Sequence, residues 1–370
     1  MATSPIPDNP LIADDYAHDM SLTGNLLRDL RKADDGTEIR GRTDWERQRE
    51  RIAKRFLAVV GNPPARPEPL DVRWGETTEM PRYVRREVSL VSEPGDRITA
   101  LALIPQGLKG RVPGILCPHP THMDGKEATA IFGHEPRDGY HYGWELAERG
   151  FITIVWDHFT VPPRVPPGKE YDSRDFERKH PDWSPLGKAM WDARRCLDLL
   201  QTMPEVDAGR IGCIGLSLGG NTTLWTSAFD ERVKAAVIAC GASTFRGDRN
   251  RRYCWVREEA NFHYMPRLGA WLDRGELPFD FHEIAARVAP RPLMIQSGYH
   301  DEWCPGSAIM GEFAARVHDI YDLYGKPEHF SHVHHGEHHS FGPMWRRLAY
   351  EWLERWLREE RWDNGYMAHG

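Results

Sequence analysis

Short apolar runs alternate with helix-like segments through most of this chain, and this alternation constrains its fold more than any other feature. The runs are rich in Val, Ile and Leu and have the length of strands: VPGILCPHP, GFITIVWDH, RIGCIGLS, VKAAVIACG and RPLMIQSGYHD. Strands that are apolar along their whole length are buried on both faces, as in a parallel sheet covered by helices. The sequence therefore predicts an α/β fold with a mostly parallel central sheet and helices on both faces.

The first 70 residues do not show this alternation of strands and helices. SLTGNLLRDLRKA (21–33) and TDWERQRERIAKRFLAVVG (43–61) have the spacing of amphipathic helices, and Thr43 and Gly61 are the expected N-cap and stop signal of the second. Four prolines follow within residues 62–70, as in a stiff connector. We predict an N-terminal helical extension with a Pro-rich connector over residues 1–70 and an α/β domain over residues 71–370. An alternating pair of runs around Glu93-Pro-Gly-Asp predicts a hairpin near the start of that domain.

Composition excludes several function classes. The net charge of −7 and the lack of a long basic run argue against a nucleic-acid partner, and no apolar stretch reaches the length of a membrane span. The N-terminus has no basic region followed by an apolar core, so we expect a cytoplasmic protein. The six cysteines are scattered without CxxC spacing, and we expect them to be buried free thiols.

The most specific motif is Gly215-Leu-Ser217-Leu-Gly219, directly after the run RIGCI and directly before a helix-like segment. In that context Gly-x-Ser-x-Gly is typical of a nucleophile elbow, a tight strand-to-helix turn that exposes the serine. A serine hydroxyl needs a base, and the base needs a carboxylate to orient it. The expected order along the chain is serine, acid, histidine. Asp301 follows the strand PLMIQSG and is the preferred acid, with Glu302 as the alternative.

The expected histidine falls in HVHHGEHHSF (332–341), which contains five histidines before the last helix. We expect this stretch to be a loop that supplies the base. The pairs His334/His338 and His335/His339 have the i, i+4 spacing of metal ligands on a helix. Gly336 interrupts that spacing and the order His-Glu-x-x-His does not occur, so we expect no metal here.

The segments MWDARRCLDLLQTMPEVDAGRIGCIGLSLGGNTTLWTSAFDERVKAAV, APRPLMIQSGYHDEWCP and HHSF…AYEWLERWL together resemble the α/β-hydrolase superfamily. The resemblance is strongest to its dienelactone hydrolase and acetylxylan esterase-like branch, and it spans roughly residues 85–360. In that branch the catalytic histidine usually stands in His-x-Phe, which here assigns the base to His339, with His338 as the alternative. The resemblance also makes residues 71–370 the catalytic domain.

An oxyanion hole needs two backbone N–H groups. The residue after the nucleophile, Leu218, is expected to supply one. Relatives usually have His-Gly after the strand VPGILC, whereas this chain has His119-Pro120-Thr121-His122. Because Pro120 has no N–H, Thr121 is the expected second donor. The residues expected to line the substrate pocket are His119, His122, Trp255, His263 and Tyr264.

These residues predict a serine carboxylic ester hydrolase that works through Ser217, His339 and Asp301 and an acyl-enzyme. The resemblance implies short-chain acetyl esters of carbohydrates as substrates, no metal or organic cofactor, and no partner other than the substrate apart from a possible homo-oligomer. Three alternatives stay open: a lactone hydrolase, although the elbow has serine where that type often has cysteine; a prolyl-oligopeptidase-like peptidase, for which residues 1–70 are too short to form a propeller; and a binding protein without activity.

Overall fold

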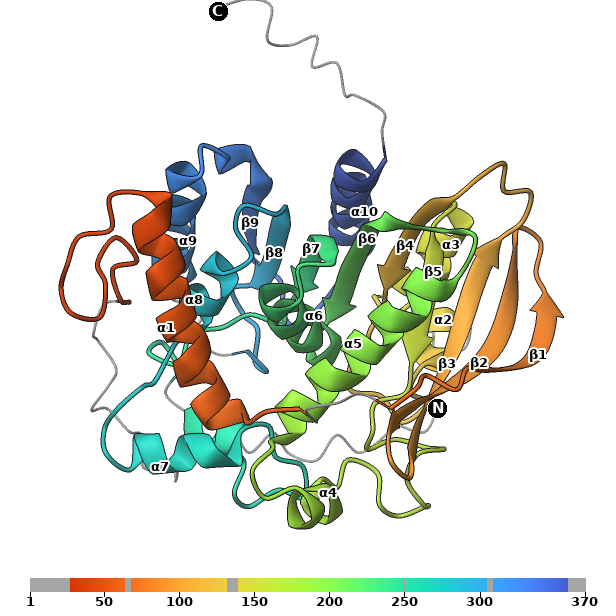
Figure 1. Cartoon of the computed structure of the whole chain (residues 1–370), viewed down its shortest axis with the longest axis horizontal. Coiled ribbons are helices and arrows are strands. Elements are labelled where there is room, and N and C mark those ends of the chain that lie inside the picture. Colours follow the sequence, from red (N-terminus) through yellow and green to blue (C-terminus); the bar gives the residue numbers. More distant parts are fainter. Residues whose placement is uncertain (1–26, 64–67, 132–138, 249–250, 305–308, 359–370) are drawn as a thin grey trace, which may run out of the picture.

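The computed structural model describes residues 27–63, 68–131, 139–248, 251–304 and 309–358. Within these residues one sheet of nine strands crosses the molecule in the order β1-β2-β3-β5-β4-β6-β7-β8-β9 (Figure 1). The strands are β1 Arg73–Glu79, β2 Tyr83–Glu93, β3 Asp96–Pro105, β4 Val112–Leu116, β5 Ile152–Trp156, β6 Val206–Leu216, β7 Val233–Ala239, β8 Leu293–Gly298 and β9 Phe330–His335.

Most of the sheet is parallel, as the apolar runs predict. β5, β4, β6, β7, β8 and β9 pair in parallel, whereas β1, β2 and β3 form an antiparallel edge that joins β5. The predicted hairpin is confirmed, because β2 and β3 turn at Gly95, whose φ of 81° suits glycine. Strand β1 was not anticipated, because its residues are almost all exposed and therefore show no apolar alternation.

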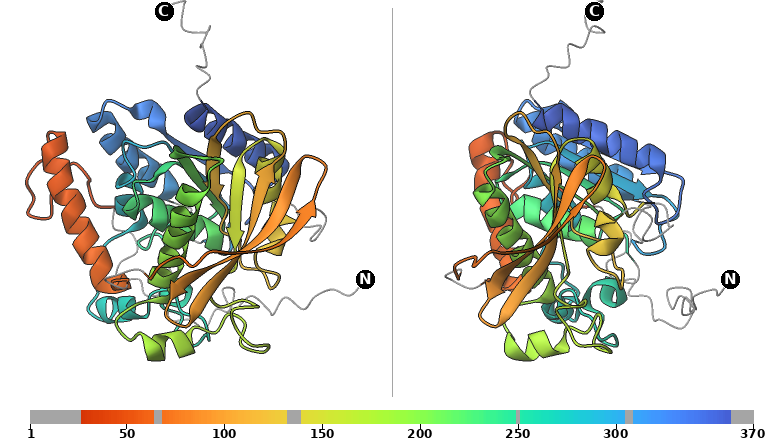
Figure 2. Two further views of the ribbon diagram at one scale, coloured as in Figure 1. Left: turned by 45° about the vertical axis from the view of Figure 1, so that its right-hand side comes forward. Right: turned by 90° about the vertical axis from the view of Figure 1, so that its right-hand side faces the viewer.

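Helices cover both faces of the sheet, as predicted (Figure 2). The face shown in front in Figure 1 has α1 Arg42–Val60, α5 Pro185–Thr202, α6 Leu218–Phe229, α8 Phe281–Ala286 and α9 Met310–Leu323. The opposite face has α3 Tyr142–Glu148 and α10 Pro343–Leu357. The short helices are α2 Glu127–Ala130, α4 Arg174–Lys179 and α7 Gly269–Leu272, and α4 and α7 lie beyond one end of the strands. Each face of the sheet therefore has its own apolar core.

The N-terminal extension differs in part from the prediction. The second predicted helix is present as α1, but Gly41 is its N-cap, so Thr43 is not; Gly61 ends it with φ 82° as expected. The first predicted helix is wrong over residues 27–33, where the chain forms turns and a bridge between Lys32 and Glu38; residues 21–26 lie outside the described part. The helical spacing there was misleading because Leu27 and Leu30 are buried by contacts with the main core rather than as one face of a helix.

Helix α1 packs into the same core as the α/β domain. Phe56 is fully buried, and its ring centroid lies 4.4 Å from that of Phe229 and 5.3 Å from that of Trp225 in α6. Arg55 forms an ion pair of 2.7 Å with the buried Glu283 of α8. Apolar stacking and a charge contact thus attach the extension to the domain, and the predicted division of the chain at residue 70 stays a prediction.

The structure also bears on the expectations for the cysteines and for membrane-spanning segments. All six cysteines are free and buried, which confirms that expectation. None of the helices in the described part combines the length and the apolar character that crossing a membrane requires.

Candidate active site

Ser217 lies on the tight turn that the glycine motif predicts. β6 ends at Leu216 and α6 begins at Leu218, so Ser217 is the single residue between strand and helix. Its φ of 57° and ψ of −120° lie in a region that residues other than glycine rarely adopt, at a cost of order 1–3 kcal/mol. A hydrogen bond of 2.9 Å from the Ser217 N–H to the Ala239 oxygen helps to hold this conformation. Backbone strain held by neighbouring structure is the geometry of a nucleophile elbow.

The glycines around Ser217 are required by close backbone approach. A Cβ on Gly215 would lie 2.3 Å from the Gly219 backbone, and a Cβ on Gly219 would lie 2.1 Å from the Pro118 oxygen. Real Cβ atoms do not approach other heavy atoms so closely, so either side chain would force the turn apart. The glycine positions are therefore explained by the packing of α6 against β6 and the loop after β4.

Asp301 and His339 are brought together by two loops. Asp301 follows β8, and His339 lies in the turn between β9 and α10. His339 Nδ1 and Asp301 Oδ1 are 2.8 Å apart. The same Oδ1 accepts N–H bonds from Trp303 and Cys304, both at 2.9 Å. Burial opposes ionisation of Asp301, but the His339 ring and the two N–H groups outweigh it and hold the pKa of this carboxyl below its usual value.

Glu302 and His338, the alternatives to Asp301 and His339, make other contacts. The Glu302 side chain is 42% exposed, and its Oε2 accepts a bond of 3.3 Å from the backbone N–H of His339 rather than from the ring. The His338 side chain is 79% exposed, and its Nδ1 lies 3.1 Å from the His300 oxygen. Neither residue therefore takes part in the contact between Asp301 and His339.

The histidine-rich stretch is only partly the expected loop. His332, His334 and His335 lie in β9, and the loop begins after them. His332 contacts the Ser297 hydroxyl at 2.9 Å, and His335 stacks on Trp345 with ring centroids 4.6 Å apart. Among the described residues, one group of three potential ligand atoms lies within 4.8 Å of one another, namely Cys240, Asp301 and His339. The group contains His339 but not His334, His335 or His338, so neither pair with i, i+4 spacing is complete in it. A strand and a turn place these rings differently from a helix.

Ser217 and His339 open onto a common cavity of about 340 Å³. Leu218 and Thr121, the two expected oxyanion donors, also line it. Leu218 is the first residue of α6, so its N–H has no acceptor within the helix and is available to a bound oxygen. The described lining residues are Pro120, Thr121, Tyr140, Leu216, Ser217, Leu218, Asn221, Tyr253, Cys254, Trp255, Arg257, Tyr264, Trp303, Cys304 and His339.

Of the five expected pocket residues, the structure places Trp255 and Tyr264 on this cavity and the three histidines elsewhere. His119 is buried and its Nε2 accepts the His158 N–H at 3.0 Å. The His122 N–H donates to the Tyr171 hydroxyl at 2.7 Å, and the His263 ring pairs with Glu177 at 2.8 Å. The assignment of these histidines to this pocket is therefore corrected: each occupies a local polar contact that sequence spacing does not reveal.

Several lining residues were missed from the sequence. Arg257 and Tyr253 are close in sequence to Trp255 and Tyr264, but nothing in the local pattern distinguished them from their neighbours. Tyr140 and Trp303 come from loops after β4 and β8. Among the described residues, five aromatic side chains and one guanidinium thus line the cavity together with Ser217 and His339, and they come from segments that only the fold brings together.

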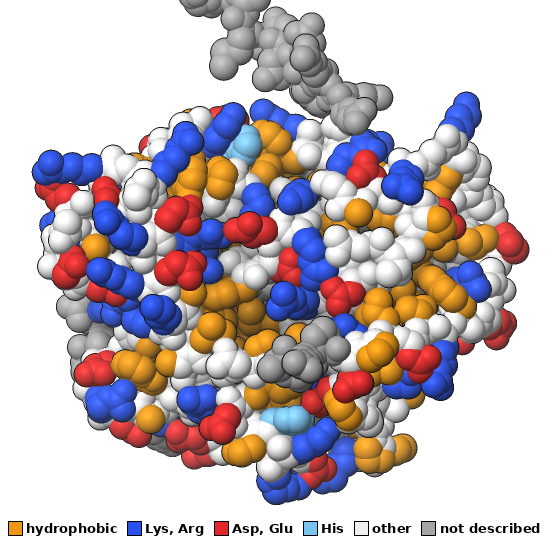
Figure 3. Space-filling model, in the orientation of Figure 1, with side chains coloured by type: hydrophobic (Ala, Val, Ile, Leu, Met, Phe, Trp, Pro, Cys, Tyr) orange, Lys and Arg blue, Asp and Glu red, His pale blue; other side chains and the backbone are white. Residues whose placement is uncertain are grey.

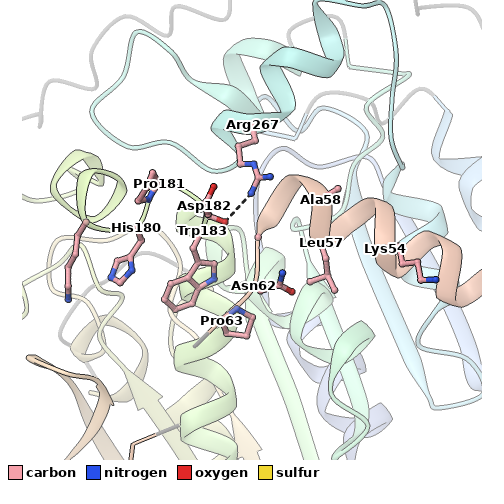
Figure 4. Close-up of a pocket in the computed structure, with 12 residues that line it drawn as sticks. Lys54, Leu57, Ala58, Asn62, Pro63, His180, Pro181, Asp182, Trp183 and Arg267 are labelled. Atoms are coloured by element: carbon pink, nitrogen blue, oxygen red, sulfur yellow. Dashed lines mark hydrogen bonds between the residues drawn. The ribbon is translucent and has the colours of Figure 1, made fainter. Parts of the chain in front are cut away.

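A larger cavity of about 720 Å³ lies away from Ser217, between α1 and the segment 179–183 (Figure 4). Arg267 reaches across it to donate a hydrogen bond of 3.0 Å to the Asp182 oxygen. Figure 3 shows this face, where apolar side chains lie between basic and acidic ones. The described residues that line this cavity include neither a serine nor a cysteine, so Ser217 and His339 mark the smaller cavity as the candidate active site.

The sequence of the chain is similar to those of several known proteins. Residues 182–325, less than half of the chain, match the family described as glucuronyl esterase, fungi. YtaP of Bacillus subtilis (strain 168), whose name says hydrolase and gives no substrate, is 25% identical over 319 residues, 82% of this chain and 98% of that protein. The 4-O-methyl-glucuronoyl methylesterase 1 of Wolfiporia cocos (strain MD-104) is 28% identical over 193 residues. This chain spans 46%, or about half, of the length of that enzyme.

Solved structures show the same architecture. The glucuronoyl esterase from Solibacter usitatus superimposes with a TM-score of 0.73 at 20% identity, over 89% of this chain and 97% of that chain. At this level of identity the likeness concerns the fold. The predicted α/β-hydrolase fold is thereby confirmed.

Proposed function

From the α/β-hydrolase fold and the site just described, we propose that the chain is a serine esterase that hydrolyses carboxylic esters of carbohydrates. The observation that supports this most directly is the contact of 2.8 Å between Asp301 and His339, on the cavity that also exposes Ser217 at its strained turn. A nucleophile, a base and an orienting carboxylate in this chain order constitute the machinery of acyl transfer.

The proposed reaction follows from the positions of the groups. His339 Nδ1 is engaged by Asp301, so the other ring nitrogen, Nε2, takes the proton of the Ser217 hydroxyl as Oγ attacks the ester carbonyl. The N–H groups of Leu218 and Thr121 stabilise the oxyanion. His339 then protonates the departing alcohol. In the second half, His339 takes a proton from a water molecule as the water attacks the acyl-enzyme, and it returns that proton to Ser217 Oγ as the acid leaves. Asp301 stays ionised throughout and stabilises the imidazolium.

Two classes of ester are proposed in order. Esters of a uronic acid carboxyl come first, because the matched family and the Wolfiporia cocos relative are named for glucuronoyl esters. Acetyl esters of carbohydrates, the expectation from sequence, come second. The five aromatic side chains around the cavity favour a sugar or an aromatic alcohol in either class, because their rings offer flat apolar faces.

The test is a substrate panel with matched variants. Initial rates are measured on methyl D-glucuronate, acetylated xylose, 4-nitrophenyl acetate, a simple lactone and a dipeptide anilide, with and without a chelator. We expect ester hydrolysis that the chelator leaves unchanged, and a loss of about 10³-fold or more in Ser217→Ala and His339→Ala. His338→Ala is the control for its neighbour, and it should retain wild-type activity because its exposed ring lies off the cavity.

The panel also decides between the alternatives. Preference for methyl D-glucuronate over acetylated xylose supports the first class, and the reverse order supports the second. Turnover confined to the lactone or to the anilide would replace the proposal by a lactone hydrolase or a peptidase. Full activity in Ser217→Ala would refute the serine mechanism.

A further inference from the structure

Arg257 is the one lysine or arginine among the described residues that line the cavity of Ser217 and His339. The same set of lining residues contains neither aspartate nor glutamate. In the part of the lining that the structure describes, a cation therefore faces the cavity with no carboxylate beside it. The low dielectric of a partly enclosed aromatic site strengthens the attraction of such a cation for an anion.

The guanidinium of Arg257 makes no ion pair within the described part of the chain. Its side-chain contact there is with the ring of Tyr264, whose centroid lies 5.2 Å from the guanidinium carbon. Arg252, five residues earlier, is a useful contrast, because it pairs with both Glu258 and Asp273. The planar donor fork of Arg257 is thus held by stacking while its N–H groups stay available for hydrogen bonds.

The backbone of Arg257 is held in an uncommon conformation by its neighbours. Its φ of 63° and ψ of 40° are left-handed, which is uncommon outside glycine. The Arg257 N–H donates to the Arg252 oxygen and the Arg257 oxygen accepts from the Ala260 N–H, each at 2.9 Å. Tyr264, on which the guanidinium stacks, packs in turn against Trp255 at 5.6 Å between ring centroids. Neighbouring structure therefore fixes both the backbone and the stacking surface of this arginine.

We propose that Arg257 binds a free carboxylate that the substrate carries in addition to the ester that is cleaved, so that the site selects esters of carbohydrates with such a further acid group. In an ester of a uronic acid the esterified carboxyl has no charge, so this carboxylate belongs to a second acid group of the substrate. A carboxylate matches the guanidinium fork in a bidentate pair, whereas a neutral sugar hydroxyl takes a single weaker bond. This inference deepens the proposed function and rests on it, because it assigns the substrate class of the same cavity. Its role is substrate binding and not proton transfer.

The first arm of the test measures binding without turnover. Sodium D-glucuronate and glucose are titrated into the Ser217→Ala protein by calorimetry, with and without the additional substitution Arg257→Met. We expect glucuronate to bind about tenfold or more tightly than glucose, and Arg257→Met to abolish that preference. Added salt should weaken glucuronate binding and leave glucose binding unchanged.

The second arm measures specificity in turnover. The ratio of kcat/KM for release of acetate from 4-acetoxybenzoate to that from the neutral 4-acetoxybenzamide is compared between variants, because the two probes carry the same acetyl ester and differ in the charged group. We expect the ratio to fall about tenfold in Arg257→Met and by less in Arg257→Lys, which keeps the charge but loses the fork. Arg274→Met is the matched control, because Arg274 stacks on Trp271 at 4.6 Å away from this cavity; it should keep the wild-type ratio.

The outcomes separate this inference from the proposed function. If the wild type hydrolyses neither these probes nor any ester of the substrate panel but still binds glucuronate through Arg257, the esterase proposal fails and Arg257 remains an anion site. If the esters are hydrolysed and neither ratio nor affinity depends on Arg257, the inference is overturned and the esterase proposal stands. Should Arg257→Met fail to fold, as judged by circular dichroism, the Lys variant and the salt dependence decide the question.

Discussion

Asp301 and His339 are 38 residues apart in the sequence, yet the Oδ1 of one lies 2.8 Å from the Nδ1 of the other. The pairing of β8 with β9 makes this possible, because it brings the loops that follow the two strands side by side at one end of the sheet. The contact engages Nδ1 of the imidazole, so Nε2 is the nitrogen that the proposed mechanism uses. Of the two neighbouring acids, Asp301 contacts the His339 ring, whereas Glu302 contacts the His339 backbone.

Asp301→Asn is expected to lower kcat by about 10²–10⁴-fold, because an amide can neither hold the required tautomer of His339 nor stabilise its imidazolium. The measurement is the steady-state rate on the best ester of the substrate panel. Glu302→Gln is the control, since its partly exposed carboxylate contacts the His339 backbone and not the ring. Equal losses in both variants would contradict the assignment of Asp301 as the orienting acid.

Gly219→Ala is expected to destabilise the protein by about 1–3 kcal/mol or more and to lower activity, because its Cβ would lie 2.1 Å from the Pro118 oxygen. Gly311 is a matched control. It is also the second residue of a helix, α9, but it has open space around its Cβ position. Gly311→Ala should stabilise by about 0.5–1 kcal/mol through helix propensity. The free energies of unfolding in urea give both values, and a stable, active Gly219→Ala protein would contradict the geometry of the turn.

Because His282 is buried, we expect the free energy of unfolding to fall in mild acid. The ring is fully buried, its Nε2 lies 3.1 Å from the Arg28 oxygen, and burial lowers its pKa to about 4, an effect that the Asp280 charge only partly opposes. Between the usual histidine pKa near 6.5 and this folded value, the unfolded chain binds more protons than the folded one, so stability falls as pH falls.

The contribution of His282 to that loss is roughly 2 kcal/mol between pH 7 and pH 5. His282→Gln cannot gain this proton, so the difference in unfolding free energy between pH 7 and pH 5 should shrink by about that amount. Urea unfolding at the two values measures it. The exposed His300→Gln is the control and should keep the wild-type difference. An unchanged pH dependence in His282→Gln would show that this ring is not held neutral by burial.

Phe56→Ala tests how far helix α1 belongs to the α/β domain. Removing a fully buried ring that stacks on Phe229 and Trp225 should cost about 3–5 kcal/mol. Leu57→Ala, one residue further on and only half-buried, should cost clearly less. The loss should appear in a single thermal transition that includes the active site. A separate early transition, with activity retained above it, would show instead that residues 1–70 form an independent unit.

The apolar runs and the glycine motif were sufficient to predict the mostly parallel sheet and the tight turn at Ser217, because each is a local pattern. The order of the three candidate catalytic residues is not local, and it was expected from the architecture and the family resemblance. Strand length, apolar continuity and Gly-x-Ser-x-Gly depend on neighbours within about ten residues. β1 and the turn region 27–33 escaped prediction for the same reason: exposed residues show no alternation, and Leu27 and Leu30 are buried by distant parts of the chain.

Only the tertiary structure decided which polar residues face the cavity. Nothing in the local sequence separates the three histidines that were expected in the pocket from the residues that do line it. The histidines are held by polar contacts elsewhere, namely His119, His122 and His263. The cavity of Ser217 is instead lined by Tyr140, Trp303 and Arg257. Convergence depends on how loops after different strands meet at one end of the sheet, and no local pattern encodes that meeting. The sequence alone thus determined the fold and the candidate nucleophile, whereas packing between remote segments determined the lining of the site and the position of Arg257 on it.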